Sequence, residues 1–89
     1  MFQMILTAEL IEKFNALKNM IADVHIKHLL YGNQKIKGCV LHPFMDEGRI
    51  GLVINDEDIY ITMDELQEFN INCVECILKS EVMELCIVI

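Results

Sequence analysis

The residues best suited to metal or redox chemistry are Cys73 and Cys76, which enclose two residues in a Cys-Val-Glu-Cys motif. This spacing occurs in zinc sites and in redox pairs. On a strand, however, residues three apart point to opposite faces, and the glycine and the second close cysteine pair of a usual zinc ribbon are missing. We therefore expect Cys73 and Cys76, like Cys39 and Cys86, to be reduced thiols that pack as small apolar side chains, and we expect no metal site.

Two further pairs could do chemistry. His25 and His28 lie three residues apart, which is workable ligand spacing on a helix. No pattern brings a third ligand to them, so a hydrogen-bonded pair at the edge of an oligomer interface is the preferred interpretation. Cys39 and His42 are the only local nucleophile and base, but their odd separation puts them on opposite strand faces. Without a phosphate-binding glycine loop, HExxH or GxSxG motif, we expect no enzyme and no cofactor.

Two stretches are suited to binding a partner protein. The loop at residues 42–49 places apolar side chains beside a rigid proline and several charges, and loops often carry function. The turn at residues 55–58 concentrates negative charge, but it has neither the ligand spacing nor the glycine of a calcium loop. This acidic edge is preferably interpreted as simply solvated; the alternatives are recognition of a basic partner and binding of a hard cation. The predicted partner-binding residues are Phe44, Met45, Asp56, Glu57 and Asp58.

A different class of function is a sponge protein that sequesters an anionic, nucleotide-like signalling molecule at a subunit interface. Such a ligand needs cations and an aromatic stacking group. Arg49 is the only arginine in the chain. The predicted residues for this alternative are Arg49, Lys35, Lys37, Tyr31 and Tyr60. A structural subunit of a larger assembly is a third alternative.

The longest element that the sequence predicts is an amphipathic helix over residues 7–30. Thr7 suits the N-cap, Leu6 and Ile11 occupy the positions of a hydrophobic staple, and Gly32 can end the helix. A helix of about 24 residues spans roughly 35 Å, as long as a compact domain of this size, so one end should overhang onto a second subunit. The apolar stripe predicted to serve the core or a homo-oligomer interface comprises Phe14, Leu17, Ile21, Val24 and His28.

After the helix, the sequence predicts about five short strands, a tight turn at residues 55–58 and one helical turn at residues 64–69. The strands are expected at residues 35–42, 49–55, 58–63, 73–79 and 82–89. A helix followed by segregated strands indicates a single α+β domain over residues 1–89 with an antiparallel sheet. Closure into a small Sm-like or SH3-like barrel is an architectural analogy only, because neither family's sequence motifs occur.

Composition limits the partners. Seven basic and fourteen acidic residues give a net charge of −7, which repels nucleic-acid phosphates and favours a basic protein partner. Of the 89 residues 54% are hydrophobic, so apolar surface should remain for a partner. No apolar run approaches 18 residues and the N-terminus lacks a basic start, so we expect neither a membrane span nor a signal peptide, but a cytoplasmic protein.

Together these features predict a small, acidic, non-enzymatic binding protein that forms a homo-oligomer. Its size, acidity and surplus apolar surface are typical of an inhibitor or adaptor that blocks a larger protein. A phage-type protein acting against a host defence system is a biological setting suggested by size and charge alone.

Overall fold

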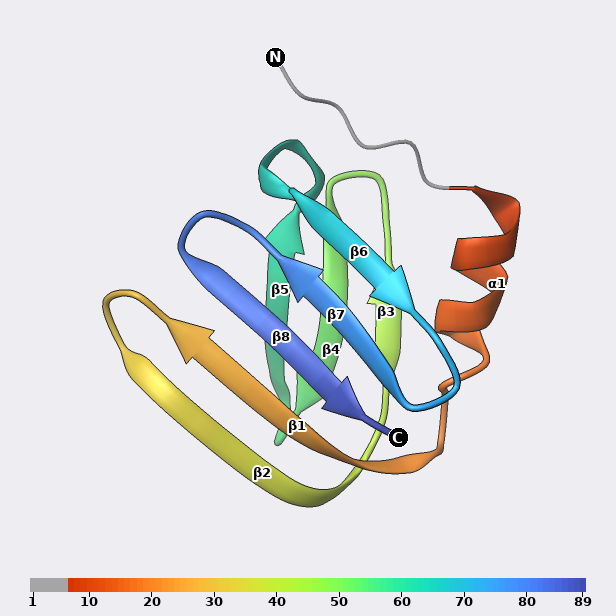
Figure 1. The fold of residues 1–89 in the computed structure, drawn as a ribbon, viewed down its shortest axis with the longest axis horizontal. Coiled ribbons are helices and arrows are strands. Elements are labelled where there is room, and N and C mark those ends of the chain that lie inside the picture. Colours follow the sequence, from red (N-terminus) through yellow and green to blue (C-terminus); the bar gives the residue numbers. More distant parts are fainter. Residues whose placement is uncertain (1–6) are drawn as a thin grey trace.

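The computed structural model describes residues 7–89 and is built mainly of β-strands in two layers (Figure 1). The strands form two antiparallel sheets, with orders β2-β1-β8-β7-β6 and β3-β4-β5. The elements are α1 Ala8–Asn15, β1 Ile21–His28, β2 Gly32–Val40, β3 Pro43–Met45, β4 Arg49–Ile54, β5 Glu57–Thr62, a 3-10 turn η1 Met63–Glu65, β6 Glu68–Ile71, β7 Glu75–Lys79 and β8 Met83–Val88.

The predicted long helix, and with it the α+β class, is wrong. The helix does begin as predicted, because the backbone N–H of Leu10 donates to Oγ1 of the N-cap Thr7 at 3.2 Å. It ends after eight residues, at Asn15. Asn19 then takes a left-handed conformation with φ 69°, and the chain continues as β1. Leu6, one half of the predicted staple, lies outside the described residues.

Residues 21–28 form a strand because their apolar pattern also has a period of two. Ala22, Val24 and Ile26 are buried on one face, while Asp23 and Lys27 lie on the other. β-branched side chains favour a strand over a helix, and β2 and β8 supply backbone partners on both sides. Apolar residues three or four apart were therefore mistaken for a helical stripe.

Two short strands were also missed. Residues 64–69 were expected to form a helical turn, but only η1 does so, and Phe69 belongs to β6, which pairs with β7. The loop at residues 42–49 contains β3, in which Pro43 is the first residue of an edge strand, a position that proline tolerates. The prediction of an antiparallel sheet is confirmed. So is the β4–β5 hairpin, whose two turn residues Asn55 and Asp56 both have positive φ, 52° and 65°.

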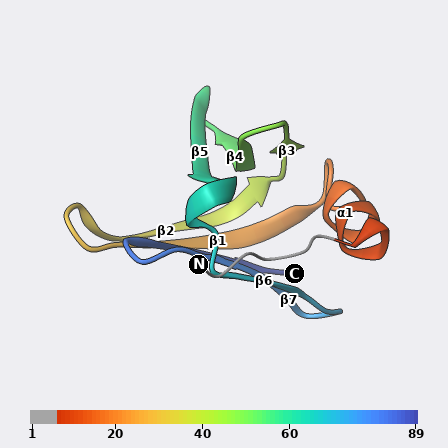
Figure 2. The same ribbon diagram turned by 90° about the horizontal axis from the view of Figure 1, so that it is seen from above.

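The core lies between the two sheets, and α1 closes one side of it (Figure 2). Phe14 of α1 is fully buried and packs edge-on against Phe69 of β6, with ring centroids 5.6 Å apart. Leu52 and Ile61 of the smaller sheet face Leu85 and other inward side chains of the larger one. This packing places three of the predicted interface residues in the core, namely Phe14, Leu17 and Val24.

The smaller sheet covers only part of the larger one. Opposite α1, the β1–β2 hairpin runs out beyond β5, and no described element lies over it (Figure 2). We call the uncovered inner face next to β5 the shelf, and its side chains include His28, Val82 and Met83. No helix within residues 7–89 is long and apolar enough to cross a membrane.

Gly51 is the position where the smaller sheet tolerates no side chain. A methyl group there would overlap the carbonyl oxygen of Ile59 and lie 2.6 Å from Cα of Tyr60, both of which are backbone atoms of β5. We expect Gly51→Ala to lower the free energy of unfolding by on the order of 3 kcal/mol in urea titrations. Gly48→Ala is the matched control, because a Cβ there meets no atom within 4 Å. Equal stability of the two variants would contradict this packing.

Candidate binding surface

Arg49 is the centre of a cluster on the outer face of the smaller sheet. Its Cζ lies 5.1 Å from the ring centroid of Phe44 on β3 and 5.1 Å from that of Tyr60 on β5. Nη2 donates to Oδ2 of Asp46 at 2.8 Å, and Nη1 donates to Oδ2 of Asp58 at 3.3 Å. The cluster therefore links all three strands of the smaller sheet through cation–π contacts and ion pairs.

The charge of Arg49 is balanced within the cluster. The hydrogen bond from Arg49 and another from the backbone of Gly48 lower the pKa of Asp46, and the same ion pair raises the pKa of Arg49. Oδ1 of Asp46 also accepts from the backbone N–H groups of Gly48 and Arg49, at 3.1 Å and 2.9 Å, which fixes the loop between β3 and β4. Arg49 thus stabilises the sheet, and an anionic ligand would have to compete with two carboxylates.

The predicted partner-binding residues are only partly brought together. Phe44 and Asp58 meet at Arg49. Met45 points the other way and packs against the core. Asp56 and Glu57 lie at the exposed β4–β5 turn.

The residues of the alternative ligand site are also dispersed. Arg49 and Tyr60 are adjacent, but Lys35 lies on β2 beside His25, on the outward face of the larger sheet. Lys37 lies at the bulge of β2, between the residues that pair with Ala22 and Val24. Tyr31 is at the tip of the β1–β2 hairpin.

The cysteine and histidine pairs do not converge either. Cys76 is fully buried while Cys73 is exposed. Burial, with a smaller contribution from Cys86, raises the pKa of Cys76 to about 12. His25 and His28 lie on opposite faces of β1, since they are three residues apart on a strand. No group of three or more potential metal ligands is found in the described part of the chain.

The most exposed large apolar side chains form the tip of the β1–β2 hairpin, a surface that the sequence prediction missed. Leu29, Leu30 and Tyr31 are 76%, 79% and 86% exposed. We call these three residues the hairpin tip. Ile21, predicted for an oligomer interface, is also exposed, but it lies at the opposite end of β1.

The hairpin tip has a defined conformation. The N–H of Leu29 donates to the carbonyl oxygen of Val82 at 2.9 Å, and the N–H of Leu30 donates to Nδ1 of His28 at 3.1 Å. The ring of Tyr31 lies against His28, with centroids 4.5 Å apart. Gly32 closes the turn with φ 80°, so it is the left-handed residue expected from the sequence, but in a hairpin instead of a helix end.

A signal for the tip was present in the sequence. Residues 22–27 alternate between apolar and polar as a strand does, and Gly32-Asn33 before the alternating residues 35–42 favours a turn between two strands. Leu29 and Leu30 were assigned to the end of the predicted helix, and Tyr31 to the turn after it and to the alternative ligand site, so the three were not recognised as one surface.

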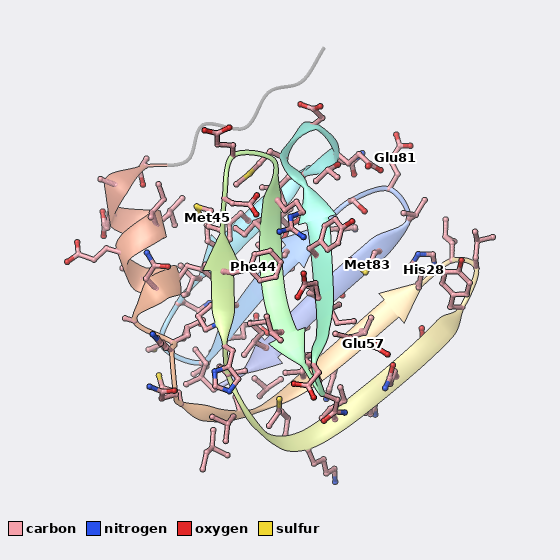
Figure 3. All side chains as sticks on the ribbon, turned by 180° about the vertical axis from the view of Figure 1, so that it is seen from behind. His28, Phe44, Met45, Glu57, Glu81 and Met83 are labelled. Carbon is pink, nitrogen blue, oxygen red and sulfur yellow. The ribbon has the colours of Figure 1, made fainter. Side chains whose placement is uncertain are left out.

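A hollow of about 280 Å³ separates β5 from the base of the hairpin tip. Its walls come from β1, β5, η1 and the β7–β8 turn, and its floor is the shelf. Figure 3 shows His28 and Met83 on this side of β5, with Glu57 at the beginning of the strand. The lining includes His28, Tyr60, Thr62, Glu65, Val82 and Met83.

No family model, curated protein or solved structure matches this chain. The surface chemistry of the chain is therefore the guide to its function. Within the described residues, the hairpin tip carries the most exposed large apolar side chains, and the hollow of about 280 Å³ adjoins it.

The burial of the thiols predicts their order of reaction. With a disulfide reagent at pH 8, we expect Cys73 to react first, because its side chain is exposed. Cys76 should react only after unfolding, since it is buried and its pKa of about 12 leaves almost no thiolate. Mass spectrometry of the modified peptides gives the order, and Cys73→Ser is the control. Rapid labelling of Cys76 in the folded protein would contradict its placement.

Proposed function

We propose that this chain is a non-enzymatic binding protein that attaches to a larger protein through the hairpin tip, in the manner of an inhibitor or adaptor. The observation that carries the proposal is the exposure of Leu29, Leu30 and Tyr31 on an ordered, projecting hairpin. Clusters of exposed apolar side chains usually mark interaction sites.

The apolar side chains of the tip can contribute a substantial part of the binding energy of a complex. Burying a large apolar side chain contributes about 1.5 to 3 kcal/mol, so three of them are worth several kcal/mol before the cost of association. The tip is already ordered by hydrogen bonds to Val82 and His28, so little conformational entropy is lost on binding. A narrow hairpin of this kind fits an apolar pocket or groove better than a flat surface.

The acidity of the chain supports a protein partner. A net charge of −7 opposes attachment to anionic lipid and to nucleic acid. A second hollow beside Leu29 is lined by Glu81 and Glu84 but also by Lys27 and Lys79, and Lys27 lies 3.8 Å from Glu84, so its charges balance. It is therefore the net charge of the whole chain that favours a partner with a basic surface.

The other predicted functions have less support. The homo-oligomer was inferred from an overhanging helix that is not present, and most of its proposed interface is core. Sequestration of an anionic ligand would require Arg49 to leave Asp46 and Asp58. We propose neither of them.

Photo-crosslinking tests the role of the tip. With p-benzoylphenylalanine at position 30, in the cells that naturally make the protein, we expect one discrete adduct with a larger protein. Adding Leu29→Ser and Tyr31→Ser should reduce its yield about tenfold or more, since central apolar contacts dominate interfaces. The same photo-reactive residue at exposed position 18, in the turn after α1, is the control and should give no such adduct.

Two results would overturn the proposal. One is the absence of any tip-specific adduct, and the other is an adduct that contains only two copies of this chain. Circular dichroism and thermal unfolding should show that the serine variants keep the parent fold, because both side chains are exposed.

A further inference from the structure

β5 is an edge strand whose hydrogen-bonding pattern can be derived from its hairpin. Residues that flank a two-residue turn exchange backbone hydrogen bonds, so Ile54 and Glu57 form a bonded pair. Bonded and non-bonded pairs then alternate along the ladder. The bond from the N–H of Met63 to the carbonyl oxygen of Gly48, 2.9 Å long, confirms the alternation one residue beyond β5.

Every second residue of β5 consequently has its backbone groups directed away from β4. These residues are Asp58, Tyr60 and Thr62, whose positions in the ladder are non-bonded. Within residues 7–89, no backbone group outside the ladder pairs with them. The free edge thus offers a row of donors and acceptors to another strand.

The other three sheet edges are protected in ways that β5 is not. β2 carries Lys35 and Lys37 and is interrupted by a bulge. β3 is three residues long and begins with Pro43, and β6 is four residues long; α1 packs beside both. β5 has six residues without a proline or bulge, and its charged residues, Glu57 and Asp58, are confined to its first two positions, with Asp58 paired to Arg49. Charged, short or irregular edges resist pairing, so β5 is the edge most open to it.

The hollow beside β5 has room for the side chains of an added strand. Alternate side chains of such a strand would point down onto the shelf, where Met83 and His28 lie. Glu57 lies at the start of β5, and Glu65 and Glu81 lie beyond its end, where they share a neighbouring hollow. The middle of the shelf therefore combines the apolar side chains of Val82 and Met83 with the ring of His28, and acidic side chains lie at both ends.

We propose that the free edge of β5 binds an extended peptide segment of a partner protein by strand addition. The shelf-facing side chains of that segment are basic, apolar and basic at alternate positions. Three such positions span about 13 Å, which fits within the length of about 20 Å of a six-residue strand. Backbone pairing supplies affinity in this mode and the alternate side chains supply specificity. The site does not depend on the hairpin tip.

The Arg49 cluster prepares β5 for this role. On the face away from the shelf, Arg49 contacts Tyr60 and pairs with Asp58. It holds the residues with free backbone groups in the extended conformation and partly neutralises Asp58. An edge that is already ordered loses less entropy when a strand is added.

Two capped heptapeptides test the proposal with the full chain. The probe is acetyl-TKTVTKT-amide, and the control of reversed charge is acetyl-TETVTET-amide. In nuclear magnetic resonance titrations we expect the probe to shift the amide signals of Asp58, Tyr60 and Thr62 and to slow their hydrogen exchange. The control should bind about tenfold more weakly or not at all, because its charges repel Glu57, Glu65 and Glu81.

A variant at Thr62 separates backbone pairing from side-chain effects. Thr62 has φ −70° and ψ 146°, which proline can adopt, so Thr62→Pro removes only a free-edge N–H from the backbone. Thr62→Val is the matched control, since both variants lose the 2.7 Å hydrogen bond from Oγ1 to Oε1 of Glu65. We expect Thr62→Pro to weaken probe binding at least about fivefold relative to Thr62→Val.

If Thr62→Pro does not fold, amide hydrogen exchange of the unsubstituted chain, measured with and without the probe, tests the proposal instead. The amides of Asp58, Tyr60 and Thr62 should exchange quickly without the probe, and those of Ile59 and Ile61 slowly. The proposal is overturned if the probe leaves this pattern unchanged, if both peptides bind equally, or if the edge is already protected by a second copy at high concentration.

Discussion

The mismatch between the two sheets determines the shape of this protein. A sheet of three strands cannot cover a sheet of five, so part of the inner face must be closed by something else or remain open. On one side α1 supplies the missing cover, with Phe14 packed against Phe69. On the other side no described element does so, and the shelf, the hollow and the hairpin tip all lie there. The features with binding potential are thus a direct consequence of incomplete coverage.

The three strands of the smaller sheet, whose free edge is β5, are held together in two ways. Close approach at Gly51 leaves no room for a side chain between β4 and β5. Across the same register, Phe44 and Tyr60 flank Gly51, with Arg49 contacting both rings. Asp46 and Asp58 compensate the cationic charge at the surface. The only arginine of the chain is therefore explained by the need to join three short strands.

The sequence predicted local structure well where turn chemistry determined it. The Thr7 cap and the Asn55-Asp56 turn depend on interactions within a few residues, and both are present. It failed at residues 21–28, where Ile21, Val24 and His28 fit a helix and Ala22, Val24 and Ile26 fit a strand equally well. Residues 21–28 form a strand because β2 and β8 pair with them on both sides, and β8 comes from a distant part of the chain.

For the candidate sites too, single residues could be selected from the sequence, but their arrangement depends on long-range strand pairing. Phe44, Arg49, Tyr60 and Asp58 were each selected from the sequence, but for two different functions, and their meeting around one guanidinium depends on sheet register. Leu29 and Leu30 were assigned to the predicted helix, so their exposure beside Tyr31 at the tip of a hairpin was not predicted. Leu29 and Leu30 are exposed because the smaller sheet does not extend over the β1–β2 hairpin, whereas Leu52 is buried between the two sheets.

The most exposed apolar side chains are gathered at the hairpin tip, so a strongly apolar sequence can still have an acidic surface elsewhere. Leu29, Leu30 and Tyr31 extend from the side of the larger sheet that neither the smaller sheet nor α1 covers (Figure 2). Edge pairing between copies is opposed by the lysines and bulge of β2, by the shortness of β3 and β6, and by a net charge of −7 on every chain. A basic, extended partner experiences attraction from that same charge. For pairing of β5 with β5 of another copy only the repulsion between like-charged chains is available, so the charge that attracts a basic strand is also what opposes self-association at this edge.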